Sequence, residues 1–246
     1  MIWTKRRLLI AVAMSDTLTS KQFYELFIRL EEDMALNESF VLGDLKYSLP
    51  EETNKWIESM DWDLEIKRLQ EQKIKVLTIL DGAYPQRLKE IYLPPIVLFY
   101  RGNLSLVNQR AVAIVGSRDH SKYAKDCIHE LIPTIVNDGI VVVSGLARGV
   151  DTLAHEETLK TSGNTIAVIG SGLDVVYPPE NANLYDLIAK RGLILSEYPL
   201  QSRPLKFHFP YRNRIIAGLS HGVCVIEAKE KSGSLITANL ALSENR

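Results

Sequence analysis

The sequence predicts an α/β protein with an open, doubly wound and mostly parallel sheet, preceded by a small all-α module. The apolar runs 111–115, 140–143 and 166–169 are unbroken and rich in β-branched residues. Such runs are typical of strands buried on both faces, and therefore of a parallel sheet covered by helices. Each run ends in a glycine-marked turn. Strand and helix patterns also alternate at the spacing of right-handed crossovers.

The first 75 residues carry only helical patterns. Thr19 and Asp61 are typical N-caps, and Pro50 suits the first turn of a helix. The expected helices span about 4–14, 20–33, 50–60 and 62–73. We expect a small helical module over residues 1–75. Packing against the larger domain and an interaction with another protein are both open as its role.

Short strands begin after residue 75, and turns or helices separate them. The expected strands span 76–80, 96–100, 111–115, 140–144, 165–169, 193–196 and 222–226. A helical turn is expected over 86–91, and helices over about 121–137, 149–161, 181–190, 212–219 and 234–244. The sheet domain is therefore expected to span residues 76–246.

Composition excludes several classes of protein. With 29 Lys and Arg against 30 Asp and Glu among 246 residues, the net charge of −1 does not indicate a general affinity for nucleic acid. Two cysteines are too few for a disulfide framework and fit a reducing cytoplasm. The basic and apolar start lacks a signal-peptide cleavage site, and no run approaches the roughly 18 apolar residues of a membrane span. A cytoplasmic protein without a membrane partner is expected.

One local segment, residues 204–220, combines basic and aromatic side chains. Its cationic or ionisable members are Lys206, His208, Arg212 and Arg214, and its rings are Phe207, Phe209 and Tyr211. Cations can contact phosphates while rings stack on bases, which is the usual pairing in a single-strand nucleic-acid site.

The glycine-marked turns predict an anion-binding cleft. Gly116-Ser117-Arg118, Ser144 to Gly149 and Ser232 to Ser234 each connect a strand to a helix, so their backbone N–H groups can face a phosphate. The carboxyl ends of parallel strands lie on one edge of a sheet, where ligands bind in this fold class. Together with the turn at Gly170-Ser171-Gly172, four turns are therefore expected to converge on one cleft.

Two further patterns receive weaker interpretations. Asp151 and His155 lie four residues apart on one helix, but no third ligand is nearby in sequence, so neither a metal site nor a catalytic residue is predicted. Asp151 suits a helix-dipole or capping role. The turn 170–175 resembles a dinucleotide fingerprint, but Val175 replaces its third glycine, and no cofactor is predicted.

Over about residues 76–246, the sequence resembles the DNA-processing protein A (DprA, or Smf) family of bacterial transformation proteins. Long, ordered motifs carry the resemblance. They include Tyr84-Pro85, Pro94-Pro95, Gly116-Ser117-Arg118, the stretches 144–151 and 170–178, Ser196-Glu197-Tyr198-Pro199, and the stretches 209–220 and 232–238. The first 75 residues only loosely resemble the family's SAM-like or helix-hairpin-like N-terminal module.

The resemblance implies an extended Rossmann-like domain that binds single-stranded DNA without a cofactor and catalyses no reaction. It also implies that incoming DNA is protected and that a RecA-type recombinase is loaded onto it. By position, Arg118 and Lys206 resemble phosphate contacts and Phe209 a stacking ring, whereas Arg212 and Arg214 either extend that path or pair with Glu197 and Glu227. The predicted DNA-binding set is Gly116, Ser117, Arg118, Ser144, Gly145, Arg148, Lys206, Phe209, Arg212, Arg214, Ser232, Gly233 and Ser234.

The oligomeric state and an alternative function stay open. The chain stops at Arg246, before a strand that the family usually continues into, so it is expected to be truncated. The homodimer implied for full-length members is therefore an open question for this chain. A phosphoribohydrolase-like nucleotide enzyme on the same sheet is the alternative function, but Thr237 stands where its pattern requires a catalytic glutamate.

Overall fold

One mixed sheet organises the protein. The computed structural model describes residues 2–33, 39–45, 49–230 and 232–246. The sheet has seven strands in the order β1-β2-β6-β5-β4-β3-β7. They are β1 (Lys75–Thr78), β2 (Val97–Gly102), β3 (Ala111–Val115), β4 (Val141–Ser144), β5 (Thr165–Ile169), β6 (Leu193–Ser196) and β7 (Val223–Val225). This architecture confirms the predicted α/β class.

The strand order and directions locate the switch point of the sheet. β6, β5, β4, β3 and β7 run parallel to one another. Beyond β6, β2 pairs antiparallel with β6, and β1 pairs antiparallel with β2. Successive connections from β3 to β6 move across the sheet in one direction, and the chain then returns to place β7 on the other side of β3. The order therefore reverses at β3. Open α/β sheets bind ligands beyond the strand ends at such a switch point.

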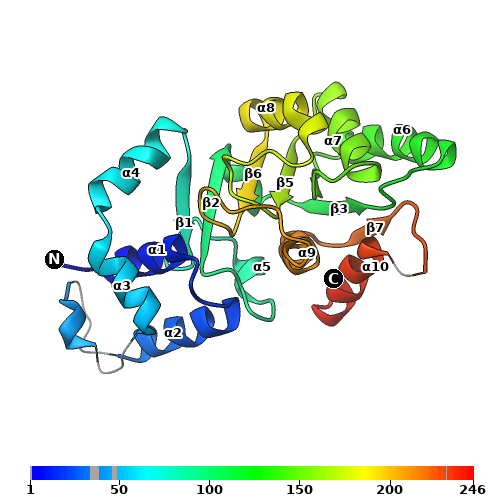
Figure 1. Cartoon of the computed structure of the whole chain (residues 1–246). Coiled ribbons are helices and arrows are strands. Elements are labelled where there is room, and N and C mark those ends of the chain that lie inside the picture. Colours follow the sequence, from blue (N-terminus) through cyan, green and yellow to red (C-terminus); the bar gives the residue numbers. More distant parts are fainter. Residues whose placement is uncertain (1, 34–38, 46–48, 231) are drawn as a thin grey trace.

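Helices cover both faces of the sheet (Figure 1). The face shown at the top carries α6 (Lys122–Asn137), α7 (Val150–Lys160) and α8 (Ala182–Arg191). The opposite face carries α9 (His208–Leu219), which packs on β3, β4 and β5, and α10 (Gly233–Ser243), which packs on β7 and α9. The short α5 (Gln86–Lys89) packs against α9. Strands enclosed in this way explain the continuous apolar runs in the sequence.

The N-terminal helices are α1 (Lys5–Ser15), α2 (Ser20–Glu32), α3 (Glu51–Ser59) and α4 (Trp62–Glu71). Thr19 and Asp61 cap α2 and α4 through their side chains, as predicted. α1 packs on β1 and β2, and one hydrophobic core connects Leu8 of α1 with Leu98 of β2 and Ile215 of α9. Short 3-10 turns occupy Leu42–Asp44, Leu104–Asn108 and Pro179–Asn181. Among the described helices, none has the length and apolarity needed to cross a bilayer.

The main difference from the predicted elements concerns α9. It begins at His208, four residues before the predicted start at 212. Pro210 therefore lies within its first turn, where a missing N–H costs no intrahelical hydrogen bond. As a result, most of the basic and aromatic segment is helical, and its side chains are distributed over different faces of a helix.

Candidate nucleic-acid interface

A cleft of about 330 Å³ lies beyond the carboxyl ends of β3, β4 and β7. Its walls come from the β3–α6 turn, the β4–α7 turn, the β7–α10 loop and one side of α9. This is the switch point of the strand order. The structure thus brings together three of the four turns that were expected to converge. The expectation was wrong for the fourth, because none of Gly170, Ser171 and Gly172 lines the cleft.

The β3–α6 turn presents Arg118 at the rim of the cleft. Gly149, with φ of +79°, allows the two turns to approach closely, because a Cβ there would collide with the Ser117 carbonyl. The Val150 N–H donates to that carbonyl at 3.1 Å. The exposed Arg118 guanidinium lies 5.7 Å from the centroid of the Phe209 ring, and it forms no ion pair within the described residues. Gly116, Ser117 and Arg118 all line the cleft.

The β4–α7 turn directs its first polar groups inward. The Ser144 hydroxyl donates to the Ile114 carbonyl at 2.7 Å, and the Gly145 N–H donates to Asp151 Oδ2 at 3.1 Å. Neither residue lines the cleft. Arg148 is exposed and forms an ion pair with Glu180. The structure therefore places Ser144, Gly145 and Arg148 outside the cleft itself.

Asp151 connects this turn to α7. Its carboxylate lies in the first turn of α7, where the helix dipole favours a negative charge, and it accepts from Gly145 N–H and, at 3.4 Å, from Ala147 N–H. Both donors precede the helix, so Asp151 fixes the turn and does not cap α7. Burial raises the pKa of the Asp151 carboxyl, and the nearby Arg212 guanidinium opposes that shift. Its neighbour His155 is also buried, and its Nδ1 lies 2.7 Å from Thr165 Oγ1. Burial, with the charge of Arg212, lowers the pKa of His155 to about 3.

Asp151 and His155 thus both have hydrogen-bond partners inside the protein. A group of three or more metal-ligating side chains is not found among the described residues.

The helical geometry of α9 divides the basic-aromatic segment. Phe209, Arg212, Asn213 and Ile216 follow the spacing of one helix face and line the cleft, together with Lys206 just before the helix. Lys206 is exposed and Phe209 half-buried. The cleft side of α9 and the residue two positions before it therefore offer one ring and one exposed cation.

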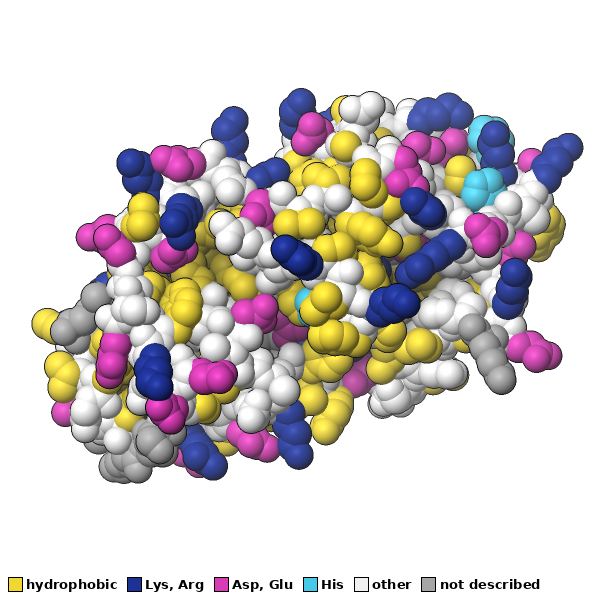
Figure 2. All heavy atoms as spheres, viewed as in Figure 1, with side chains coloured by type: hydrophobic (Ala, Val, Ile, Leu, Met, Phe, Trp, Pro, Cys, Tyr) yellow, Lys and Arg dark blue, Asp and Glu magenta, His cyan; other side chains and the backbone are white. Residues whose placement is uncertain are grey.

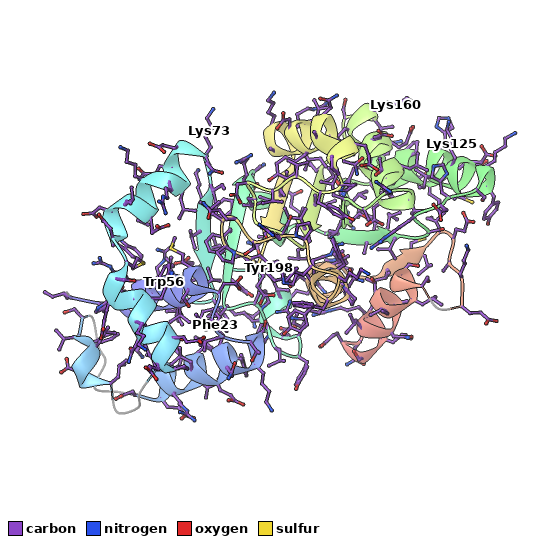
Figure 3. The ribbon with its side chains drawn as sticks, viewed as in Figure 1. Phe23, Trp56, Lys73, Lys125, Lys160 and Tyr198 are labelled. Carbon is purple, nitrogen blue, oxygen red and sulfur yellow. The ribbon has the colours of Figure 1, made fainter. Side chains whose placement is uncertain are left out.

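The other face of α9 lines a separate cavity of about 520 Å³ towards α1 and α2, and its members include Phe207, His208 and Tyr211. Tyr198, labelled in Figure 3, stacks on His208 with ring centroids 3.9 Å apart. Asp16 and Glu197 supply the carboxylates of this cavity, and none of its described lining residues is Lys or Arg. The negative charge of these carboxylates therefore makes this cavity unsuited to binding phosphate.

Arg212 forms part of the cleft wall but is only 4% exposed. Its Nη1 donates to the carbonyls of Gly145, at 2.7 Å, and Val168. A Cβ at position 145 would collide with this guanidinium, so the glycine makes room for it. Burial lowers the pKa of Arg212 to about 10, although Asp151 favours its charged form. Arg212 holds α9 against the ends of β4 and β5.

Arg214 points away from the cleft. Its Nη2 lies 2.6 Å from Glu197 Oε1, and its Nε donates to the Leu93 carbonyl at 3.1 Å. The Tyr211 ring lies 4.3 Å from the guanidinium carbon. Of the two internal pairings considered for these arginines, the structure shows the one with Glu197. Glu227 instead accepts a hydrogen bond from Ser121 N–H at 2.8 Å.

The third wall is the start of α10. Ser232, Gly233 and Ser234 line the cleft, and the two serine hydroxyls lie 2.9 Å apart. The first N–H groups of a helix have no intrahelical partner, and the helix dipole favours an anion beside them. Asn213 Nδ2 donates to the Gly233 carbonyl at 3.2 Å and fixes α10 against α9. This helix end therefore adds a partial positive charge to that of the cations at the rim of the cleft.

The rim of the cleft carries a local excess of positive charge. Arg118, Lys206 and Lys229 are exposed around it, and no ion pair of theirs occurs in the described part of the chain. Figure 2 shows Lys and Arg side chains gathered beside an apolar area over the region where α9 meets the strand ends. We call Arg118, Lys206 and Lys229 the rim cations.

The predicted site set lacks several residues that line the cleft, among them Lys229, Asn213 and Asp119. Lys229 follows β7 and lines the cleft, although only the serines and glycine after it were predicted. Asn213 lines it as well, and helical spacing from Phe209 would have identified it had α9 been given its full length.

Comparison with known proteins places the chain among DNA-processing proteins. A family model described as DNA recombination-mediator protein A matches residues 75–246. The DNA processing protein DprA of Streptococcus pneumoniae is 53% identical over 175 residues, which cover 71% of this chain and 62% of that protein. The Bacillus subtilis protein of the same name is 48% identical over 177 residues, covering 72% and 60%. The matched region thus spans about three fifths of each relative.

Solved structures agree with this placement. The crystal structure of DprA from S. pneumoniae has a TM-score of 0.84 and 43% identity, and the match covers 97% of this chain and 83% of that one. DNA processing protein A from Helicobacter pylori, solved in a study of its single-stranded DNA binding mode, has a TM-score of 0.65 and 34% identity, covering 70% and 78%.

Proposed function

The chain belongs to the DNA recombination-mediator protein A (DprA/Smf) family, and from this premise we propose that it binds single-stranded DNA in the cleft beyond β3, β4 and β7. The observation that carries the proposal is the position of the rim cations. All three surround one cleft that also contains the half-buried Phe209 ring and a helix N-terminus. This combination suits phosphates and bases of an unpaired strand. The single-stranded DNA binding of the H. pylori relative supports it.

Each group in the cleft receives a role under this proposal. Arg118, Lys206 and Lys229 contact phosphates, and Phe209 stacks on a base. Backbone N–H groups at Gly116, Ser117 and the start of α10 add hydrogen bonds to phosphate oxygens. Arg212 shapes the wall, and Arg214 stabilises α9 from behind, because both guanidinium groups are already engaged inside the protein.

We propose a binding function without catalysis. At the position where a nucleotide phosphoribohydrolase would need a glutamate, Thr237 is buried, and its hydroxyl donates to the Gly233 carbonyl at 3.4 Å. That side chain is a helix-start contact and offers no carboxylate for acid–base chemistry.

The cellular role proposed for the whole protein follows the family. We propose that it takes part in natural transformation and recombination, protects incoming single strands in the cytoplasm, and loads a RecA-type recombinase onto them. We also propose a homodimer as its working form. The description of the family as a recombination mediator supports this role.

Binding of labelled oligo-dT tests the proposed function directly. We expect a Kd of about micromolar or tighter at low salt, with little dependence on base sequence. If each of the three rim cations contacts one phosphate, and each contact releases about 0.7 counterions, the slope of log K against log salt is about −2. A titration at several salt concentrations measures both quantities, with the mass of the protein determined in parallel. A folded sample that does not bind at low salt contradicts the proposal.

Replacement of Phe209 tests the stacking role. Phe209→Leu keeps an apolar side chain of similar bulk but removes the ring, so we expect a loss of about 1–3 kcal/mol in binding to oligo-dT with little change in melting temperature. Tyr92→Ala is the matched control, because Tyr92 is 75% exposed and lies outside the cleft. Equal affinity of Phe209→Leu and the parent would exclude stacking on this ring.

A further inference from the structure

A second pocket adjoins the cleft on the opposite side of Phe209. Its volume is about 160 Å³, and it lies between the β4–α7 turn, the end of β5 and the segment at Tyr177-Pro178. It is distinct from the cavity that faces α1 and α2, with which it shares no lining residue. The predicted site set contains Arg148 and Gly145 from its wall but not Tyr177.

Arg118 and Phe209 form a ridge between this pocket and the cleft, since both residues line both spaces. Behind the ridge, the Tyr177 ring lies 5.4 Å from the Phe209 ring at an interplanar angle of 40°. Arg118, Phe209 and Tyr177 therefore form one row in which each group lies beside the next, with the two rings tilted relative to one another. Tyr177 is 43% exposed, so part of its ring is available to a ligand.

The dimensions of the pocket fit one nucleobase. A cavity of about 150 Å³ in a protein core holds a benzene molecule, so about 160 Å³ admits one six-membered ring. The Gly145 and Gly170 carbonyls in its wall already face Arg212 Nη1 and His208 Nδ1. These two acceptors are thus not free to recognise the edge of a base. Recognition is therefore expected to depend on stacking, which every base can provide.

The charges at the mouth of the pocket fit the phosphate backbone of the DNA strand that is proposed to bind in the cleft. Arg118 stands on the ridge, where the phosphate between two neighbouring nucleotides would lie. Arg148 lies at the outer side, in a surface ion pair with Glu180 whose side chains are 63% and 47% exposed. Exposed pairs contribute little to stability, so this arginine can exchange Glu180 for a phosphate at small cost. Asp119 also lines both spaces and can accept a hydrogen bond from a base N–H.

We propose that this pocket is a second base site for the bound single strand, with Tyr177 as its stacking ring. Two neighbouring bases lie on either side of the Arg118–Phe209 ridge, and the phosphate that joins them contacts Arg118. This inference rests on the proposed function, because it extends the same strand beyond the cleft. It adds Tyr177 to the DNA contacts and gives Arg148 a phosphate contact outside the cleft.

Competition between minimal ligands tests the second site. The dinucleotide dTpdT and an analogue lacking one base compete with fluorescent oligo-dT for the parent, Tyr177→Ala and Tyr177→Leu. For the parent, we expect dTpdT to compete about 5- to 150-fold better than the abasic analogue. Both Tyr177 variants should lose most of this preference, while a thymidine mononucleotide competes equally well with the parent and the variants. Tyr92→Ala should behave as the parent.

The outcomes separate the two proposals. If the parent does not bind oligo-dT at all, the proposed function fails. If it binds oligo-dT but does not distinguish dTpdT from the abasic analogue, the second site is excluded while the cleft stands. A folded Tyr177→Leu variant that keeps the full preference for dTpdT also overturns the role of Tyr177. Leucine preserves apolar packing against Phe209, so this variant separates stacking on a base from support of the ridge.

Discussion

Replacement of Arg214 by methionine is expected to lower the free energy of unfolding by about 3–5 kcal/mol and to leave the oligo-dT affinity of the folded protein unchanged. The guanidinium and the Glu197 carboxylate are 7% and 14% exposed, with 2.6 Å between Nη2 and Oε1. Removal of the arginine leaves a buried carboxylate without its partner, and an unpaired buried charge is strongly unfavourable. Urea unfolding and oligo-dT titration of the same sample measure the two effects.

Arg68→Met is the matched control for this experiment. Arg68 Nη1 also lies 2.6 Å from a carboxylate oxygen, that of Glu65, but these side chains are 50% and 22% exposed. A surface pair is expected to contribute less than about 1 kcal/mol. The double variant Arg214→Met/Glu197→Gln should recover part of the lost stability. A stable Arg214→Met protein with weakened DNA binding would show instead that Arg214 contacts the strand.

The double variant Arg118→Ala/Lys206→Ala is expected to bind oligo-dT at least about a hundredfold more weakly than the parent. Each charge-assisted hydrogen bond to a phosphate contributes about 1.5–3 kcal/mol, so two lost contacts exceed roughly 3 kcal/mol. The slope of log K against log salt should also become shallower by about 1.4, because about 0.7 counterions are released per phosphate. Both side chains are exposed, so the melting temperature should change little.

Lys125→Ala/Lys160→Ala controls for the change in net charge. Both lysines are exposed on the outer side of α6 and α7, away from α9 (Figure 3). This variant also removes two positive charges, but neither of them belongs to a rim cation. If the two double variants weaken binding equally, the effect is one of overall charge, and the proposed contacts of Arg118 and Lys206 are wrong. A changed salt slope in the first variant alone supports them.

Most of the fold could be predicted from local patterns. The strands at 111–115, 165–169 and 193–196 agree with β3, β5 and β6, because buried parallel strands carry continuous apolar runs. The glycine-marked turns after the strands indicated where the cleft would form, since parallel strands bring their carboxyl ends to one edge. The antiparallel pairing of β1 with β2 could not be derived in this way, because short strands carry no signal of their partner.

The start of α9 shows where local reasoning failed. Phe207, Phe209 and Tyr211 have modest helix propensity, and a proline is unfavourable in a helix beyond its first turn, so local preference favours a start after Pro210. In the structure the proline occupies the first turn, and burial of α9 against β3, β4 and β5 outweighs weak local preference. Once the helix begins at His208, its periodicity separates the groups that face the cleft from those that face α1 and α2.

The sequence by itself determined the α/β class, the order of strands and helices, and the edge of the sheet where the binding turns meet. These follow from periodicity and turn residues within short segments. Only the tertiary structure decided which cations face that cleft. Arg118 and Arg214 have the same charge, but Arg214 is enclosed with Glu197 and the Leu93 carbonyl, groups far from it along the chain. The environment of a charged side chain depends on such distant partners, because burial is favourable only when hydrogen bonds and opposite charge replace water.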